Sequence, residues 1–404
     1  MQILWGIFGI IAILAIAFLL STNKKAINVR TIVSALLLQF IFGFIVLKWK
    51  TGKELFEWIT NFVQRIIDTS NEGIQFLFGG VLAGEGVAFV FAFQVLTVII
   101  FFSSLISVLF YLGVMQFITK AVGGFLAMIL KTTKPESMSA AANIFIGLTE
   151  APLVVKPFLA KMSKSELFAV MTGGAASVSG SVLVGYSLLG VPLDYLIAAA
   201  FMAAPAGLLM AKVLVPETEV QAEDQVIKFE KDTETVNIID AASKGALTGL
   251  KLALNIGALL LAFISLIALV NLGLEWIGSL VGFENITLEK ILGVVLSPLA
   301  FVIGVPWDEA LKAGSYIGQK FVLNEFVAFS SFAEEIDTFS DKTVAIISFA
   351  LCGFANLGAI GMMIGGMGGL APSRRKDLAR YSFLAVIGGT LANLLSAAIA
   401  GMLL

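Results

Sequence analysis

Apolar runs long enough to cross a bilayer as helices recur along the whole chain. About 20 apolar residues are enough for one crossing. The pattern predicts spans at residues 3–20, 31–47, 87–118, 167–189, 193–213, 246–272, 344–363 and 383–404. Residues 49–78 and 275–289 instead alternate apolar and charged positions at helical spacing, which is typical of helices lying along the membrane surface. The sequence therefore predicts an all-α polytopic membrane protein with about eight transmembrane helices plus interfacial helices.

Two apolar stretches are interrupted. Residues 137–145 and 151–159 are each too short to span and are joined at Gly147-Leu148-Thr149-Glu150, with lysines on both flanks. This pattern predicts a re-entrant hairpin that enters and leaves on the cytoplasmic side. The alternative is an ordinary span kinked at proline, with Glu150 at a helix–helix contact. We expect a second, external hairpin over residues 291–305, broken at Pro298 and followed by the segment that contains Glu325.

The two interrupted stretches predict an inverted repeat, which is the architecture of secondary transporters with a site where the repeats meet. The expected division of the chain has four parts. They are a scaffold at 1–118, a first transport-domain repeat at 119–215, an acidic loop with a scaffold helix and interfacial segment at 216–289, and a second repeat at 290–404.

Composition supports the membrane class and excludes several chemistries. The chain is 58% hydrophobic and only 13% charged, against roughly 25% charged residues in soluble domains. It has no histidine and one cysteine, Cys352, which excludes a histidine relay, a Ser-His-Asp triad and a histidine-ligated metal site. A net charge of −2 predicts no nucleic-acid partner. With these groups missing we predict a transporter and not an enzyme, with no cofactor.

Charged loops predict the topology. Lys24, Lys25 and Arg30 lie between the first two spans without an acid, so this loop is expected in the cytoplasm and the N-terminus outside. The first apolar run is interpreted as a retained helix in the plasma (inner) membrane. Glu85 is interpreted as an interface residue, with an ionic site as the alternative, and the acidic loop as a solvated connector.

Glu150 and Glu325 stand in apolar segments with no basic residue close by in those segments. Such carboxylates are tolerable where they accept hydrogen bonds from a neutral ligand rich in donors, because bonds to a charged acceptor are strong. Thr149 and Asn356 add donors and acceptors, and Phe354 offers a flat apolar face, although core packing explains Phe354 equally well. The chemistry suits a polar, uncharged, partly aromatic small molecule.

A cation site is predicted nearby. Asn143 ends the first half-hairpin, and Ser177 lies in the glycine- and serine-rich centre of the 167–189 span. Their side chains, with the carbonyls of Ile146 and Val178, would form a neutral cage suited to a monovalent ion. A hydrogen bond between Asn143 and Ser177 that ties two helices is the alternative.

At these residues the chain resembles the concentrative nucleoside transporters in their shorter bacterial form. The resemblance covers nearly the whole chain and rests on GLTEAPLVVK at 147–156, GSVLVGY at 180–186, NEFVA at 324–328, CGFAN at 352–356 and the stretch 365–375. It implies a homotrimer in which a scaffold carries the oligomer contacts and a transport domain moves like an elevator in the lipid bilayer. It also implies ion-coupled nucleoside uptake. The implied substrate-binding residues are Gly147, Leu148, Thr149, Glu150, Val182, Glu325, Phe354, Asn356 and Ala359, and the implied sodium ligands are Asn143, Ile146, Ser177 and Val178.

Two positions depart from the family pattern. Residue 148 is commonly glutamine and is leucine here, and residue 359 is commonly serine and is alanine here. Loss of a hydrogen-bonding group can shift selectivity greatly. The base preference is therefore left open. From the retained Asn143 and Ser177 we expect a nucleoside importer driven by sodium ahead of protons. A transporter of free nucleobases or modified nucleosides is the first alternative; a passive channel or an intramembrane enzyme is the second.

Overall fold

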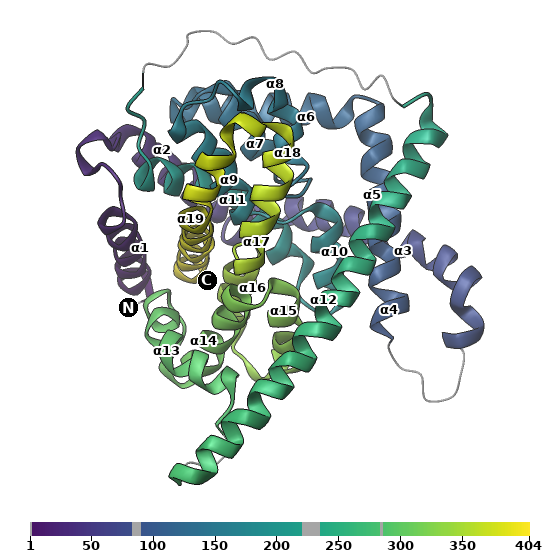
Figure 1. Ribbon diagram of the computed structural model, residues 1–404, viewed down its shortest axis with the longest axis vertical. Helices are drawn as coiled ribbons and strands as arrows, with labels where there is room; N and C mark the ends of the chain where they lie inside the picture. Colours follow the sequence, from purple (N-terminus) through teal and green to yellow (C-terminus); the bar gives the residue numbers. More distant parts are fainter. Residues whose placement is uncertain (1, 83–89, 220–234, 283–285) are drawn as a thin grey trace.

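The computed structural model describes residues 2–82, 90–219, 235–282 and 286–404, and every regular element in these ranges is helical (Figure 1). Seven of the described helices are long and apolar enough to cross a membrane, and a bent pair could add an eighth. The all-helical membrane class is confirmed. Glu85 and most of the acidic loop lie outside the described residues.

The first two spans pack on one helix from each half of the rest of the chain. They are α1 (Gln2–Leu19) and α2 (Val29–Leu47), and both contact α11 (Leu193–Leu214) and α19 (Arg375–Leu403). Gly6 lets α1 approach α19 closely, because a Cβ at this position would collide with the Met402 side chain. The amphipathic stretch forms α3 (Lys50–Leu82), as its pattern predicts.

A second group is the long pair of α5 (Leu96–Tyr111) and α12 (Ile238–Val281), which crosses one side of the molecule in Figure 1. Gly249 allows this close pairing, since a Cβ would lie 2.7 Å from the Ile100 Cα. The predicted separate interfacial segment at 275–289 is wrong. No glycine in a left-handed conformation ends α12 until Gly282, whose φ is +78°.

The predicted span at 87–118 is confirmed only in part: residues 91–111 are long and apolar enough to cross a membrane, but this helical segment does not continue to residue 118. The described part forms α4 (Phe91–Gln94), α5 and then α6 (Val114–Leu130). Gly113 separates α5 from α6 with a φ of +82°, a conformation that glycine adopts without steric cost.

The first interrupted stretch contains short helices separated by irregular backbone. In chain order these are α7 (Lys134–Ala142), η2 (Ala151–Val155), α8 (Lys156–Leu159), α9 (Lys164–Ala176) and α10 (Gly180–Leu188). The glycine- and serine-rich span is therefore broken between α9 and α10, at residues 177–179. The course of α7, η2 and α8 relative to a membrane stays a prediction.

The second interrupted stretch breaks at a different place from the predicted one. Its elements are α13 (Leu288–Val302), α14 (Trp307–Val322), α15 (Glu325–Glu334), α16 (Asp341–Leu351) and α17 (Leu357–Met362). Helix α13 runs through Pro298, because the Val294 carbonyl, which loses its backbone donor to the proline, accepts a 3.1 Å bond from the Ser297 hydroxyl. The chain instead bends by 116° between α13 and α14.

The corrected elements repeat the order of the first half. Helix α14, the interruption at Leu323–Asn324 and α15 correspond to α7, the Glu150 corner and η2 with α8. Helices α16 and α17, separated by residues 352–356, correspond to α9 and α10. Glu150 and Glu325 thus stand at equivalent points of the two halves, which supports an internal repeat.

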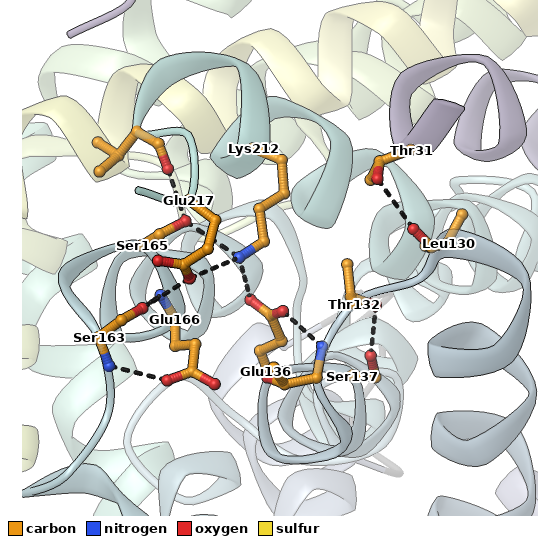
Figure 2. Close-up of polar contacts among 12 residues, drawn as sticks. Thr31, Leu130, Thr132, Glu136, Ser137, Ser163, Ser165, Glu166, Lys212 and Glu217 are labelled. Carbon is orange, nitrogen blue, oxygen red and sulfur yellow. Dashed lines mark hydrogen bonds and ion pairs between the residues drawn. The ribbon is translucent and has the colours of Figure 1, made fainter. Parts of the chain in front are cut away.

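A buried polar cluster fixes one end of the first half (Figure 2). The Lys212 ammonium, near the end of α11, lies 2.7 Å from a Glu136 carboxylate oxygen and donates a 3.0 Å bond to the Ser165 hydroxyl. Glu136 also accepts a 2.8 Å bond from the Thr133 amide at the start of α7. Glu136 is fully buried, so its ion pair with Lys212 joins α7 to α11 inside the protein, and the Lys212–Ser165 bond adds α9.

We predict that Lys212→Met lowers the free energy of unfolding by about 3–5 kcal/mol, because it leaves the Glu136 charge buried and unpaired. Thermal unfolding of the purified protein in detergent measures this loss. Lys156→Met, at an exposed position, is the control and should leave the transition unchanged. An unchanged transition in Lys212→Met would contradict the proposed contribution of the Lys212–Glu136 pair to stability.

Candidate functional site

Gly147 lies where the Glu150 corner meets both helix breaks. A Cβ at Gly147 would lie 3.7 Å from the Ser179 Cβ, 3.9 Å from a Glu150 carboxylate oxygen and 4.0 Å from the Phe354 ring. The Gly147 amide donates a 3.3 Å bond to the Glu150 carboxylate. The corner therefore brings a carboxylate, a small polar residue and an aromatic ring together from three separate segments. Glycine keeps the space between them open.

The second carboxylate is held by the break between α16 and α17. The Asn356 side-chain amide donates a 2.8 Å bond to Glu325, and its oxygen accepts a 2.9 Å bond from the Ala359 amide. Asn356 is thus the N-cap of α17 and the partner of Glu325 at once. Asn324 caps α15 in the same way, by accepting a 2.9 Å bond from the Val327 amide. The NEFVA and CGFAN segments consequently position Glu325 through helix capping.

Backbone hydrogen bonds join separate segments at the breaks. The Phe354 amide donates a 3.1 Å bond to the Ser177 carbonyl, and the Gly180 amide donates a 3.0 Å bond to the Phe145 carbonyl. Groups that an intact helix would pair internally are paired here between segments: the Phe354–Ser177 bond joins the two halves, and the Gly180–Phe145 bond lies within the first half. The break that carries Phe354 and Asn356 therefore lies directly against the break that carries Ser177.

The remaining predicted substrate residues differ in exposure. Thr149 is exposed, and its methyl group packs against Gly366. Leu148 is 3% exposed and packs against Gly174 of α9, while Val182 is 1% exposed. Contact of Leu148 and Val182 with a substrate stays a prediction.

One of the predicted cation ligands, Asn143, is a buried amide without a hydrogen-bond partner among the described residues. Asn143 is 1% exposed, and neither its oxygen nor its nitrogen has a hydrogen-bond partner among the described residues. The Ser177 hydroxyl donates a 3.0 Å bond to the Gly173 carbonyl, so the structure does not contain the alternative Asn143–Ser177 bond. Ile146 and Val178 are buried as well. Because a buried amide without partners is costly, its chemistry fits an oxygen ligand for a cation.

Sequence reasoning missed two buried residues at the breaks. The Lys320 ammonium donates a 2.8 Å bond to the Ala350 carbonyl and a 2.7 Å bond to the Asn393 side-chain oxygen. The Asn393 nitrogen donates 2.6 and 3.0 Å bonds to the Ala176 and Cys352 carbonyls. An isolated lysine beside an apolar stretch and an isolated asparagine within the last apolar run were the available signals.

Family models match three consecutive parts of the chain. The model described as Na+ dependent nucleoside transporter C-terminus matches residues 195–401, and its N-terminal counterpart matches residues 8–81. A model described as nucleoside recognition matches residues 92–192. Together they cover both halves and the breaks between the helices.

Relatives of known name extend over the full chain. The nucleoside permease NupC of Helicobacter pylori is 47% identical over 99% of this chain and 97% of its own length. An uncharacterized transporter of Bacillus subtilis is 56% identical over 100% of both chains. The rat sodium/nucleoside cotransporter 2 is 37% identical over 98% of this chain and 62% of its own length.

A solved structure has the same fold. The structure of CNTnw in an inward-facing substrate-bound state superposes with a TM-score of 0.95, at 52% identity, over 100% of this chain and 98% of the other. The family models and these relatives agree with the geometry of the broken helices. The chain belongs to the concentrative, Na+-dependent nucleoside transporter family.

Proposed function

We propose that this protein is a secondary active transporter that imports nucleosides, driven by a sodium gradient. The observation that carries the proposal is the pairing of two carboxylate sites with one unpaired amide at the helix breaks. Glu150 and Glu325 supply acceptors for a neutral substrate, and Asn143 supplies an oxygen for a cation. The relatives named as nucleoside permease and sodium/nucleoside cotransporter support both halves of this assignment.

The nucleoside would bind between the two repeats. Thr149 and Glu150 would meet the base edge, and the half-buried Phe354 ring would stack on its face. Glu325 and Asn356 would hold the ribose hydroxyls through hydrogen bonds to a charged acceptor. Gly147, Leu148, Val182 and Ala359 would line the remaining surface. Ala359 has no hydroxyl to offer the ribose. Its backbone amide donates to the Asn356 side-chain oxygen and so helps to orient Asn356.

The sodium ion would sit at the end of α9. Its ligands would be the Asn143 amide oxygen, the Ser177 hydroxyl oxygen and the carbonyls of Ile146 and Val178. The last carbonyls of a helix carry partial negative charge and lack internal donors, so a cation stabilises the end of α9. Ion binding at Ser177 would affect nucleoside affinity through the Phe354–Ser177 backbone bond, because Phe354 contacts the base in this arrangement.

For the assembly we propose a homotrimer in the plasma membrane, with the N-terminus outside, re-entrant hairpins and an elevator-type transport domain. The α5–α12 pair, with exposed leucines at 254, 261 and 269 of α12, suits the stationary scaffold. Packing of α1 and α2 on α11 and α19 argues for assigning these two spans to the moving unit. That assignment differs from the predicted scaffold boundary at residue 118.

The coupling ion is tested by uptake of radiolabelled uridine and adenosine into vesicles. We expect uptake above equilibrium with an inward sodium gradient, and its loss when choline replaces sodium. Collapse of the proton gradient should leave uptake unchanged. Sodium-independent uptake that requires a proton gradient would contradict the sodium assignment, and a passive channel would give no accumulation.

We predict that Glu325→Gln raises the uridine Kd by about tenfold or more, because it removes a charged acceptor. Isothermal titration calorimetry of purified protein measures the change. The control is Glu335→Gln, at the far end of the same helical segment. The Glu335 carboxylate is exposed to solvent, where the Lys312 ammonium lowers its pKa. Unchanged affinity in Glu325→Gln would remove this residue from the nucleoside site.

We predict that Asn143→Ala raises the sodium concentration for half-maximal uridine uptake by about tenfold, since it removes one cation ligand. The measurement is a sodium titration at fixed uridine. Asn237→Ala is the matched control: Asn237 is an exposed N-cap far along the chain, at the start of α12. A wild-type sodium dependence in Asn143→Ala would place the ion elsewhere.

A further inference from the structure

The carboxyl ends of α9 and α16 both carry partial negative charge, and a different kind of side chain lies beside each end. Each half-helix stops inside the protein and leaves carbonyls that no residue of the same helix can pair. Their partial negative charge favours a cation at each end. Beside Gly173 of α9 lies the neutral Asn143 amide, which has no hydrogen-bond partner among the described residues. At α16 the neighbouring side chain is the ammonium of Lys320.

Burial and hydrogen bonds hold the Lys320 ammonium at the end of α16. It is 1% exposed and lies at the end of α14, where it donates to the Ala350 carbonyl at 2.8 Å. A buried ammonium is costly unless it is paired and hydrogen-bonded. Its second bond, of 2.7 Å, goes to the Asn393 side-chain oxygen on α19.

Asn393 carries the link across to the first repeat. With its oxygen towards the ammonium, its nitrogen points to carbonyls, donating to Ala176 at 2.6 Å and Cys352 at 3.0 Å. A flipped amide would face donor to donor and acceptor to acceptor, so the three bonds fix one orientation. The chain from Lys320 to Ala176 therefore spans the ends of both broken helices.

Gly353 leaves room for this link. A Cβ at residue 353 would collide with the Asn393 side-chain oxygen and would lie 2.7 Å from the Ala176 carbonyl oxygen. The glycine of the CGFAN segment is required by that close approach and not by its backbone angle, because Gly353 is absent from the positive-φ residues of the described chain.

We propose that Lys320 is a positioning residue that acts as a fixed cation for the second break, and that Asn393 transmits this constraint to the first break. Through Ala350 and Cys352 the link holds the segment that carries Phe354 and Asn356. Through Ala176 it holds the segment that carries Ser177 and Val178. In this arrangement the protein supplies its own cation at α16 and leaves only the end of α9 for a diffusible ion.

Amide hydrogen exchange tests the link without any ligand. In Lys320→Met we expect peptides covering 174–180 and 350–356 to exchange about tenfold faster or more, since a hydrogen bond to a charged group is lost. Peptides from α5 and α12 should be unchanged. The control, Lys312→Met, lies on the same helix with a half-exposed ammonium paired to Glu335 and should change neither break. Faster exchange at 350–356 alone, or at neither break, would overturn the proposal.

Gly353→Ala gives an independent route if Lys320→Met does not fold. Its methyl group displaces Asn393 while the Lys320 ammonium remains, and the same two peptides should exchange faster. Wild-type exchange at both breaks in a folded Gly353→Ala protein would overturn the link.

Binding constants of the folded fraction separate positioning from stability. This arm rests on the proposed sodium-coupled nucleoside site. Lys320→Met should raise both the uridine Kd and the half-saturating sodium concentration by about tenfold, whereas a stability defect alone lowers the folded fraction and leaves both constants unchanged. Wild-type constants would overturn the positioning role. If the wild-type protein binds no nucleoside but the two variants exchange faster at both breaks, the proposed function is refuted and the link stands.

Discussion

The structure depends on how interrupted helices satisfy their backbone groups. In a membrane protein an unpaired amide or carbonyl costs several kcal/mol, yet this chain interrupts helices in both repeats. The bonds Phe354–Ser177 and Gly180–Phe145 pair backbone with backbone across segments. Asn356, Asn324 and Asn393 pair further backbone groups through their side chains. The proposed binding residues are therefore placed by the same groups that make the breaks tolerable.

This constraint relates stability to function. At the end of α16 the protein supplies partners itself, through Lys320 at the Ala350 carbonyl and Asn393 at the Cys352 carbonyl. Where a partner is missing, as at the buried Asn143 amide, an ion can stabilise the site by binding. Since Ser177 is bonded to the Phe354 backbone, ion and nucleoside would share one stretch of structure, and binding of either would favour the other.

Much of the fold could be predicted from the sequence. Apolar length identified most membrane helices. The glycine- and serine-rich centre of residues 167–189 was open to two interpretations, close helix packing and an unwound backbone, and the structure has a break there between α9 and α10. The errors arose where local signals are ambiguous. Pro298 was expected to break a helix, but the Ser297 hydroxyl pairs the carbonyl that the proline frees. Helix α12 was expected to end near residue 272, although no helix-ending glycine precedes Gly282.

The site was predictable to the extent that lone polar residues in apolar segments mark it. Glu150, Glu325 and Asn356 carried that signal, and the structure gives Glu325 and Asn356 a shared hydrogen bond. The Lys320–Asn393 link could not be predicted, because its members are far apart in sequence and meet only after α14 and α19 pack. The burial of Leu148 against Gly174 likewise depends on packing between helices.

The central claim is that cation and nucleoside bind to one coupled site at the helix breaks. Calorimetric titration of purified protein with uridine at increasing sodium concentration tests it most directly, with choline holding ionic strength constant. The account predicts that the uridine Kd falls as sodium rises and that uridine tightens sodium binding by the same factor. A uridine Kd that does not change with sodium would contradict it.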